Sequence, residues 1–127
     1  MSIIEFPYLI HKGYYMPIIP IRISDHKIWT YVDSGATFSI FDAKEAKRLG
    51  VNLKQGKAEM IVVGDGSFIP TYFHDLNLCI GNFEFTAPIG FSERLGVGFN
   101  LLGRKEIFDH FIVCFWDKER KVTFQQI

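Results

Sequence analysis

Short apolar runs separated by turn-forming residues fill most of the chain, and this pattern predicts a mostly β structure. Strands are expected at residues 14–23, 28–32, 39–41, 58–63, 67–73, 76–80, 83–89, 112–116 and 122–126. Two tight turns are expected between them, at the Asp-Gly pair 65–66 and the Gly-Asn pair 81–82, because these residues tolerate positive φ. Many short strands joined by regular turns are typical of an all-β fold, here a closed, barrel-like one.

Two segments break this pattern and predict two short helices. In the first, at 42–50, Asp42 can cap the N-terminus and Glu45 follows three residues later, as in a capping box. Apolar residues then recur at helical spacing until Gly50 ends the segment. The second helix is expected at 104–111. We expect the first to pack on a sheet.

The composition fits one small globular domain, which we place at residues 1–127. The chain has 127 residues, with 14 basic and 14 acidic side chains and no net charge. A nucleic-acid partner is therefore not expected, because phosphate binding usually requires a basic excess. The apolar fraction of 48%, with thirteen Phe, hints that some apolar surface is covered by a second subunit.

The apolar runs and the cysteines exclude several other classes. No run approaches the ~20 apolar residues that span a bilayer, and the N-terminal segment lacks the pattern of a signal peptide. We therefore expect no membrane association and a cytoplasmic location. Cys79 and Cys114 lie in apolar runs and are expected to be buried free thiols, with a disulfide or metal pair as the alternative. No His or Cys spacing resembles a zinc site, so no metal and no cofactor are expected.

One segment carries candidate chemistry. An apolar strand runs directly into Asp33, followed by Ser34 and Gly35. The glycine permits a tight turn and close approach of another group, and the serine hydroxyl can hydrogen-bond within the loop. In an arbitrary protein this triplet indicates only a turn.

Three elements in order make the signal more specific. They are Asp33-Ser34-Gly35-Ala36, the apolar hairpin 60–70 with its Gly64-Asp65-Gly66 tip, and Leu101-Leu102-Gly103-Arg104. In these elements the chain resembles the retropepsin-like aspartic proteases over residues 14–126. The resemblance implies the acid-protease fold with a flap hairpin. It also implies an aspartic endopeptidase with catalytic residues Asp33, Ser34 and Gly35.

The family's chemistry needs two carboxyls that share one proton, one acting as base on a water and the other polarising the scissile carbonyl. The sequence contains one such motif, because Asp65 lies at a polar hairpin tip without an apolar strand before it. The resemblance therefore implies a homodimer in which two Asp33 carboxyls meet and Ser34 hydrogen-bonds across the axis.

The resemblance further implies that an extended peptide or protein substrate lies under the flap. The residues expected to bind it are Ala36, Thr37, Val62, Val63, Gly64, Asp65, Gly66 and Phe68. For the apolar flap side chains the alternative is that they only pack beneath the hairpin.

Two features depart from the retroviral members. Thr37 replaces an acidic residue, so Arg104 lacks its usual partner and is expected to lie in solvent or to pair elsewhere. The closing hairpin, 112–126, casts doubt on the interleaved chain ends that hold retroviral dimers together.

Two other functions remain open. One is a catalytically silent dimerisation or peptide-binding module. The other is a regulatory domain whose site is completed by another protein.

Overall fold

The computed structural model describes residues 2–127. Its strands are β1 (Ile3–Pro7), β2 (Leu9–His11), β3 (Tyr14–Met16), β4 (Ile18–Ile23), β5 (His26–Val32), β6 (Ser39–Asp42), β7 (Lys57–Val62), β8 (Phe68–Ile80), β9 (Phe83–Ser92), β10 (Asn100–Leu102), β11 (Phe111–Trp116) and β12 (Lys121–Gln126). Its helices are α1 (Ala43–Leu49) and the 3-10 turns η1 (Leu53–Gln55) and η2 (Phe108–His110). The molecule is mostly β, as the sequence predicts.

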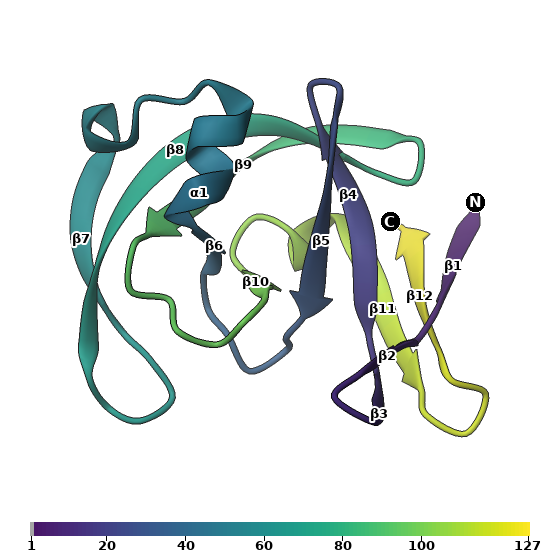
Figure 1. Ribbon diagram of the computed structural model, residues 1–127. Coiled ribbons are helices and arrows are strands. Elements are labelled where there is room, and N and C mark those ends of the chain that lie inside the picture. The colour runs from purple at the N-terminus through teal and green to yellow at the C-terminus, as the bar shows by residue number, and fades with distance from the viewer. Residues whose placement is uncertain (1) are drawn as a thin grey trace.

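The largest sheet has the strand order β4-β5-β10-β6-β9-β8-β7 and curls around the core (Figure 1). A second pairing joins β4 to β8 through Arg22 opposite Cys79 and Ile23 opposite Leu78. The long hairpin β8–β9 crosses the back of the molecule, while β7 and the first half of β8 form a projecting hairpin. Between β6 and β7 the chain forms α1, which packs on β6 and β9. The expected closed barrel stays a prediction.

A separate three-stranded sheet has the order β1-β12-β11, so the first and last strands lie side by side (Figure 1). Ile3 pairs with Gln125 at one end of the β1–β12 ladder and Pro7 with Lys121 at the other. Because β12 pairs with β11 as well, both of its edges are occupied within the chain. Next to this sheet, β2 and β3 form a small hairpin.

Apolar faces of both sheets meet in one core. Its fully buried side chains include Phe41, Phe91, Phe124, Ile19 and Leu102, from five different strands. A smaller cluster of Ile40, Ile69 and Leu95 lies beneath the projecting hairpin. Because Ile69 pairs with Ile61 near the tip, this cluster holds the outer part of the hairpin against the body of the fold.

The first predicted helix is confirmed. Asp42 Oδ1 accepts a hydrogen bond of 2.9 Å from Lys44 N, and Gly50 ends α1 with φ of 72°. Glu45 does not complete a capping box. It is buried, bonds to Arg48 at 2.6 Å and accepts a bond of 2.8 Å from Asn100 Nδ2.

The second predicted helix is wrong. Residues 104–111 contain only the 3-10 turn η2, because their backbone is engaged elsewhere. Arg104 N and Lys105 N donate to the carbonyls of Ala36 and Thr37, at 2.9 Å and 2.8 Å. Glu106 has φ of 59°, which a right-handed helix does not allow.

Several strand boundaries also differ from the prediction. The expected run 14–23 divides at Pro17 into β3 and β4, and the two runs 67–73 and 76–80 form the single strand β8. The sequence pattern missed β1, β2 and β10 entirely. Cys79 and Cys114 are free thiols, as expected, but both are partly exposed rather than buried. Between residues 2 and 127, no helix has the length and apolarity needed to cross a bilayer.

Candidate active site

Asp33 is the first residue after β5, and two neighbouring segments fix the backbone around it. Leu102 of β10 lies opposite Val32 in parallel pairing, and Asp33 N donates to Leu102 O at 3.0 Å. On the other side, Val32 N donates to Pro17 O at 2.9 Å. The chain therefore leaves the end of β5 at Asp33 in a defined direction.

The loop after Asp33 is held by the segment around Gly103. Gly103 N donates to Ser39 Oγ at 2.9 Å. A Cβ built on Gly103 would lie 2.2 Å from Phe38 O and 2.9 Å from Ala36 O, so only glycine fits between these two loops. The two sequence motifs, 33–36 and 101–104, are thus in direct contact.

The Asp33 side chain is half-buried. Its Oδ1 accepts one hydrogen bond of 2.9 Å from Gly35 N. No Lys, Arg or His among residues 2–127 forms an ion pair with it. The second carboxylate oxygen is thus available to a further group.

Asp33 lies at the junction of two cavities. The larger, of about 760 Å³, is here called the cleft and runs between Asp33 and the projecting hairpin. Its lining residues are Met16, Tyr31, Asp33, Gly35, Ala36, Thr37, Phe38, Ile40, Met60, Ile61, Val62, Val63, Gly64, Leu95, Val97, Phe99 and Leu101. Asp33 and Tyr31 are its ionisable side chains; the remaining walls are almost entirely apolar.

The cleft brings together seven of the residues expected from sequence: Asp33, Gly35, Ala36, Thr37, Val62, Val63 and Gly64. It does not include Asp65, Gly66 or Phe68, which lie at the exposed end of the hairpin, nor Ser34, which faces the second cavity. Val62 is exposed and does not pack beneath the hairpin, whereas Val63 contacts the small apolar cluster.

Asp65 organises the hairpin tip. Its Oδ1 accepts bonds from Ser67 N at 2.9 Å and from Ser67 Oγ at 2.6 Å. These bonds lower the pKa of Asp65 below its usual value. Gly66 then adopts φ of 85°, which closes the turn.

Sequence reasoning missed the opposite wall of the cleft. Leu95, Val97 and Phe99 come from the loop between β9 and β10, and Met16 and Tyr31 from the strands before Asp33. The glycine-rich stretch at 96–98 signals a loop, but nothing local shows that it folds toward Asp33.

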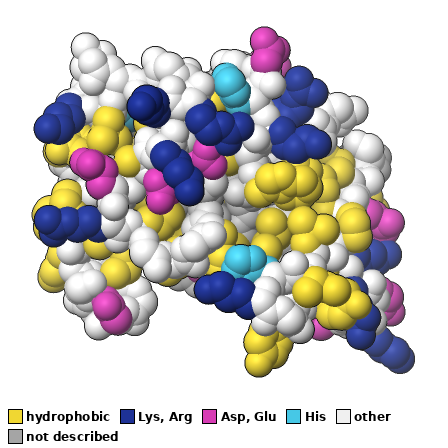
Figure 2. Space-filling view, in the orientation of Figure 1, with side chains coloured by type: hydrophobic (Ala, Val, Ile, Leu, Met, Phe, Trp, Pro, Cys, Tyr) yellow, Lys and Arg dark blue, Asp and Glu magenta, His cyan; other side chains and the backbone are white. Residues whose placement is uncertain are grey.

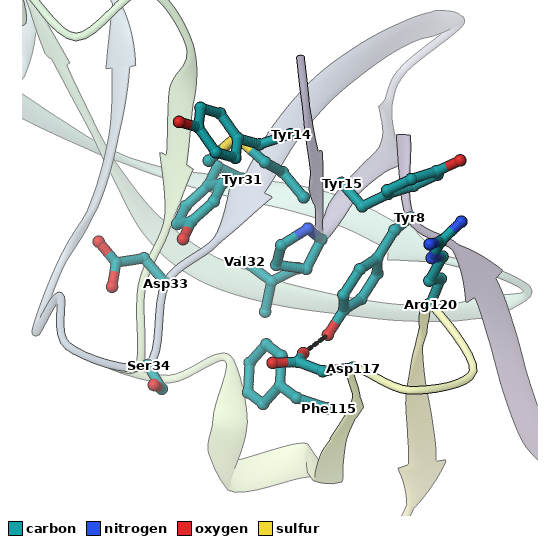
Figure 3. A pocket seen from close by; sticks show the side chains of 12 residues that line it. Tyr8, Tyr14, Tyr15, Tyr31, Val32, Asp33, Ser34, Phe115, Asp117 and Arg120 are labelled. Atoms are coloured by element: carbon teal, nitrogen blue, oxygen red, sulfur yellow. Dashed lines mark hydrogen bonds between the residues drawn. The ribbon is translucent and has the colours of Figure 1, made fainter. Parts of the chain in front are cut away.

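The second cavity, of about 530 Å³, is here called the hollow (Figure 3). Its lining residues are Tyr8, Tyr14, Tyr15, Met16, Pro17, Tyr31, Val32, Asp33, Ser34, Phe115, Asp117 and Arg120. Asp33 and Ser34 lie at one side, Tyr15 and Arg120 at the other, with Tyr8 between them. None of the hollow's aromatic residues was expected at the site.

Two contacts shape the hollow. The Tyr8 hydroxyl donates to Asp117 Oδ1 at 2.7 Å, and the Arg120 guanidinium lies 3.8 Å from the centre of the Tyr15 ring. Burial, followed by the hydrogen bond to Asp117, raises the pKa of Tyr8. Burial also raises the pKa of Tyr31, with a further contribution from the charges of Asp33 and Asp117.

Arg104 is exposed and forms no ion pair with any described residue, in agreement with the replacement of its usual partner by Thr37. Its backbone, not its side chain, supports the site, through the bond to Ala36 described above.

Comparisons with known proteins identify the class. A family model described as aspartyl protease matches residues 19–103. The chain therefore belongs to the aspartyl protease family. No curated protein sequence matches it.

Two solved structures share the fold of this chain. A retropepsin-like aspartic protease from Rickettsia conorii is 20% identical, with a TM-score of 0.71 over 97% of this chain and 91% of that one. EIAV protease in complex with the inhibitor HBY-793 is 16% identical, with a TM-score of 0.60 over 80% of this chain and 92% of that one. The resemblance to retropepsin-like proteases is confirmed.

Proposed function

We propose that this protein is an aspartic endopeptidase that acts as a homodimer on extended peptide segments. The observation that carries the proposal is the position of Asp33, with a carboxylate free of any cation, at the edge of an apolar cleft covered by a hairpin. Membership of the aspartyl protease family supports the same conclusion.

A single Asp33 cannot perform the reaction, because one carboxyl cannot accept a proton from water and polarise the scissile carbonyl at the same time. A second Asp33 on a two-fold axis would supply the missing group. Two carboxyls so close cannot both ionise, so the pair would share one proton and titrate as a unit.

In the reaction, the ionised carboxyl removes a proton from a water whose oxygen attacks the carbonyl carbon. The protonated carboxyl donates a hydrogen bond to the carbonyl oxygen, on which negative charge develops. When the C–N bond breaks, a proton passes to the leaving nitrogen and the carboxyls return to their starting state. The attack is by water, so no covalent intermediate forms.

The surrounding residues would act by positioning. Gly35 N–H holds Asp33 Oδ1, and Ser34 would hydrogen-bond across the axis. Met60 and Val62 of β7 would cover the substrate, while Asp65 and Gly66 keep the hairpin tip closed. Exclusion of water beneath this flap would strengthen the electrostatic interactions at Asp33. A cytoplasmic location stays a prediction.

The test is cleavage of an unfolded polypeptide from about pH 3 to about pH 7, a range that covers carboxyl titration. Asp33→Asn should lower kcat/KM by about 10²–10⁴-fold, the usual contribution of an acid–base group. Asp25→Asn, in the exposed turn between β4 and β5, is the matched control and should retain full activity. Equal activity of Asp33→Asn and the parent would exclude this mechanism.

A further inference from the structure

A third cavity adjoins the cleft on the other side of the loop between β9 and β10. It has a volume of about 490 Å³ and is here called the basic cavity, after Lys27, Lys44 and Arg48 in its wall. β5 and α1 supply these three side chains. Leu95 and Phe99 of the loop line both cavities, so the loop forms a shared rim between them.

The acidic residues of the basic cavity are already engaged. Asp42 Oδ1 accepts a hydrogen bond from Lys44 N, and the Glu45 carboxylate is bonded to Arg48 and to a side-chain amide of β10. The ammonium groups of Lys27 and Lys44 form no ion pair with any residue in the range 2–127. Two cations in the wall are therefore available to an anionic group from outside the chain.

This excess of unpaired positive charge distinguishes the basic cavity from four other cavities of the molecule. In the cleft the one charged side chain is Asp33, and in the hollow Asp33 and Asp117 outnumber Arg120. A cavity beside Cys79 has one basic and one acidic residue, and a cavity beside Phe38 has more acidic than basic residues. Figure 2 shows Lys and Arg side chains gathered over α1. A chain without net charge thus concentrates positive charge beside its cleft.

A buried nitrogen in the wall also lacks a partner. His11 lines the basic cavity, and its Nε2 is buried without a hydrogen bond to any residue between 2 and 127. Buried polar groups are rarely left in this state, so the atom points to a missing partner. The His11 ring lies edge-on to Phe99, with 5.4 Å between the ring centroids. A carboxylate that displaced the edge of Phe99 would accept a hydrogen bond from Nε2.

The rim between the two cavities carries few side chains. Leu95, Val97 and Phe99 line the cleft, whereas Gly96 and Gly98 line the basic cavity. Both glycines have positive φ, 72° and 77°, and a Cβ built on Gly98 would meet no atom within 4 Å. An extended peptide that leaves the cleft can therefore cross the rim at the glycines.

We propose that the basic cavity binds an acidic side chain of the substrate, in the part of the peptide that extends past Phe99 beyond the cleft. Lys27 and Lys44 pair with its carboxylate, so the preferred substrates combine an apolar segment for the cleft with Asp or Glu beside it. The inference rests on the proposed function, because it takes the occupant of the cleft to be an extended peptide. It adds the charge that such a peptide carries and the residues that recognise it.

The test is the binding of two labelled peptides to the full chain carrying Asp33→Asn, so that no peptide is consumed. Both peptides have an apolar core of alternating Val and Phe, flanked on both sides by Glu in one and by Gln in the other. At low ionic strength the Glu-flanked peptide should bind about fivefold more tightly, as expected for two exposed ion pairs. The difference should disappear in the double variant Lys27→Gln/Lys44→Gln, and it should decrease as salt is added.

The matched control is the double variant Lys47→Gln/Lys54→Gln. It removes the same charge from exposed residues of α1 and η1 that do not line the basic cavity. It should keep the preference for the Glu-flanked peptide. Circular dichroism melts should show that both double variants fold.

The outcomes separate the two proposals. A chain that binds neither peptide, binds both equally, or loses the preference in the control as well overturns the acidic-substrate site and leaves the proposed function standing. A peptide of Glu alone that binds as tightly as the Glu-flanked peptide overturns the connection with the cleft. A preference that depends on Lys27 and Lys44, in a parent protein that never cleaves a peptide, supports the site and overturns the proposed function.

Discussion

The cleft and the hollow, which lie on two sides of Asp33, are lined by different types of residues. The cleft side is mostly apolar and lies beneath a hairpin whose Ile69 packs on Ile40 and Leu95, whereas the hollow side is tyrosine-rich and held by side-chain contacts between distant segments. The Asp33 carboxylate lines both cavities. The two sides therefore differ in the chemistry of their walls and in the contacts that hold them.

The contacts support that distinction. The hairpin exposes Met60, Val62 and Phe68 on one face, while Ile69 on the other face is buried against Ile40 and Leu95. In the hollow, Tyr8 and Asp117 join the two ends of the chain, and Arg120 stacks on Tyr15.

We expect the largest effect on stability and activity from a substitution at Gly103, which packs against the loop that follows Asp33. Gly103→Ala would place a methyl group against two backbone carbonyls that cannot move independently. We expect it to lower the free energy of unfolding by about 3 kcal/mol and kcat/KM by about 100-fold, through displacement of the Asp33 loop. Gly64→Ala, which meets no atom within 4 Å, is the control for urea unfolding. Identical unfolding curves for Gly103→Ala and the parent would contradict this account of the junction.

A charge on the cleft side should affect catalysis without affecting stability. Val62 is 57% exposed in the free protein, so Val62→Asp should change the free energy of unfolding by less than about 0.5 kcal/mol. Its carboxylate would lose water when an apolar peptide binds, which should lower kcat/KM by about tenfold. Trp29→Asp, at 46% exposure on β5 and outside the cleft, should leave kcat/KM for the same apolar peptide unchanged. Equal losses in the two variants would show that the cleft is not the binding surface.

We expect the smallest effect from a substitution in the hollow. Tyr8→Phe removes the hydrogen bond to Asp117 and should lower the free energy of unfolding by about 1 kcal/mol. Because the folded-state pKa of Tyr8 is raised, its stabilisation is present below about pH 10 and is lost as the pH rises further. Denaturant titrations above that pH should therefore show a shallower decline for Tyr8→Phe than for the parent, with part of the decline remaining because of Tyr31. Tyr14→Phe is the control, and an equal loss of stability there would contradict a specific role for Tyr8.

Local chemistry made much of the fold predictable. Turn residues at 65–66 and 81–82 lie in hairpins, and Asp42 and Gly50 bound α1 as expected. The segment 104–111 was misjudged because its backbone donors bond to the Asp33 loop, a tertiary contact that no local pattern reports. β1 was missed because its partner lies at the other end of the chain.

The candidate site likewise contains residues that local sequence motifs predict and residues that only the tertiary fold brings together. Asp33 and the cleft side of its own loop were found because they adjoin a short motif. Leu95, Phe99 and the tyrosines of the hollow were missed because they reach Asp33 only through the folding of separate loops. Asp65 and Phe68 were assigned to the binding surface from their place in the hairpin, and the structure puts them beyond the cleft.

The pairing of β1 with β12 has a consequence for folding during translation. β1 is translated well before β12, so Ile3 cannot pair with Gln125 until the residues between them have been made. During synthesis the apolar side chains of β1 and the Tyr8 ring lack their final neighbours, and such long-range closure is slow. The hollow beside Asp33 can form only after the turn between β11 and β12 has been translated, so a nascent chain carries the motif before the surface around it is complete.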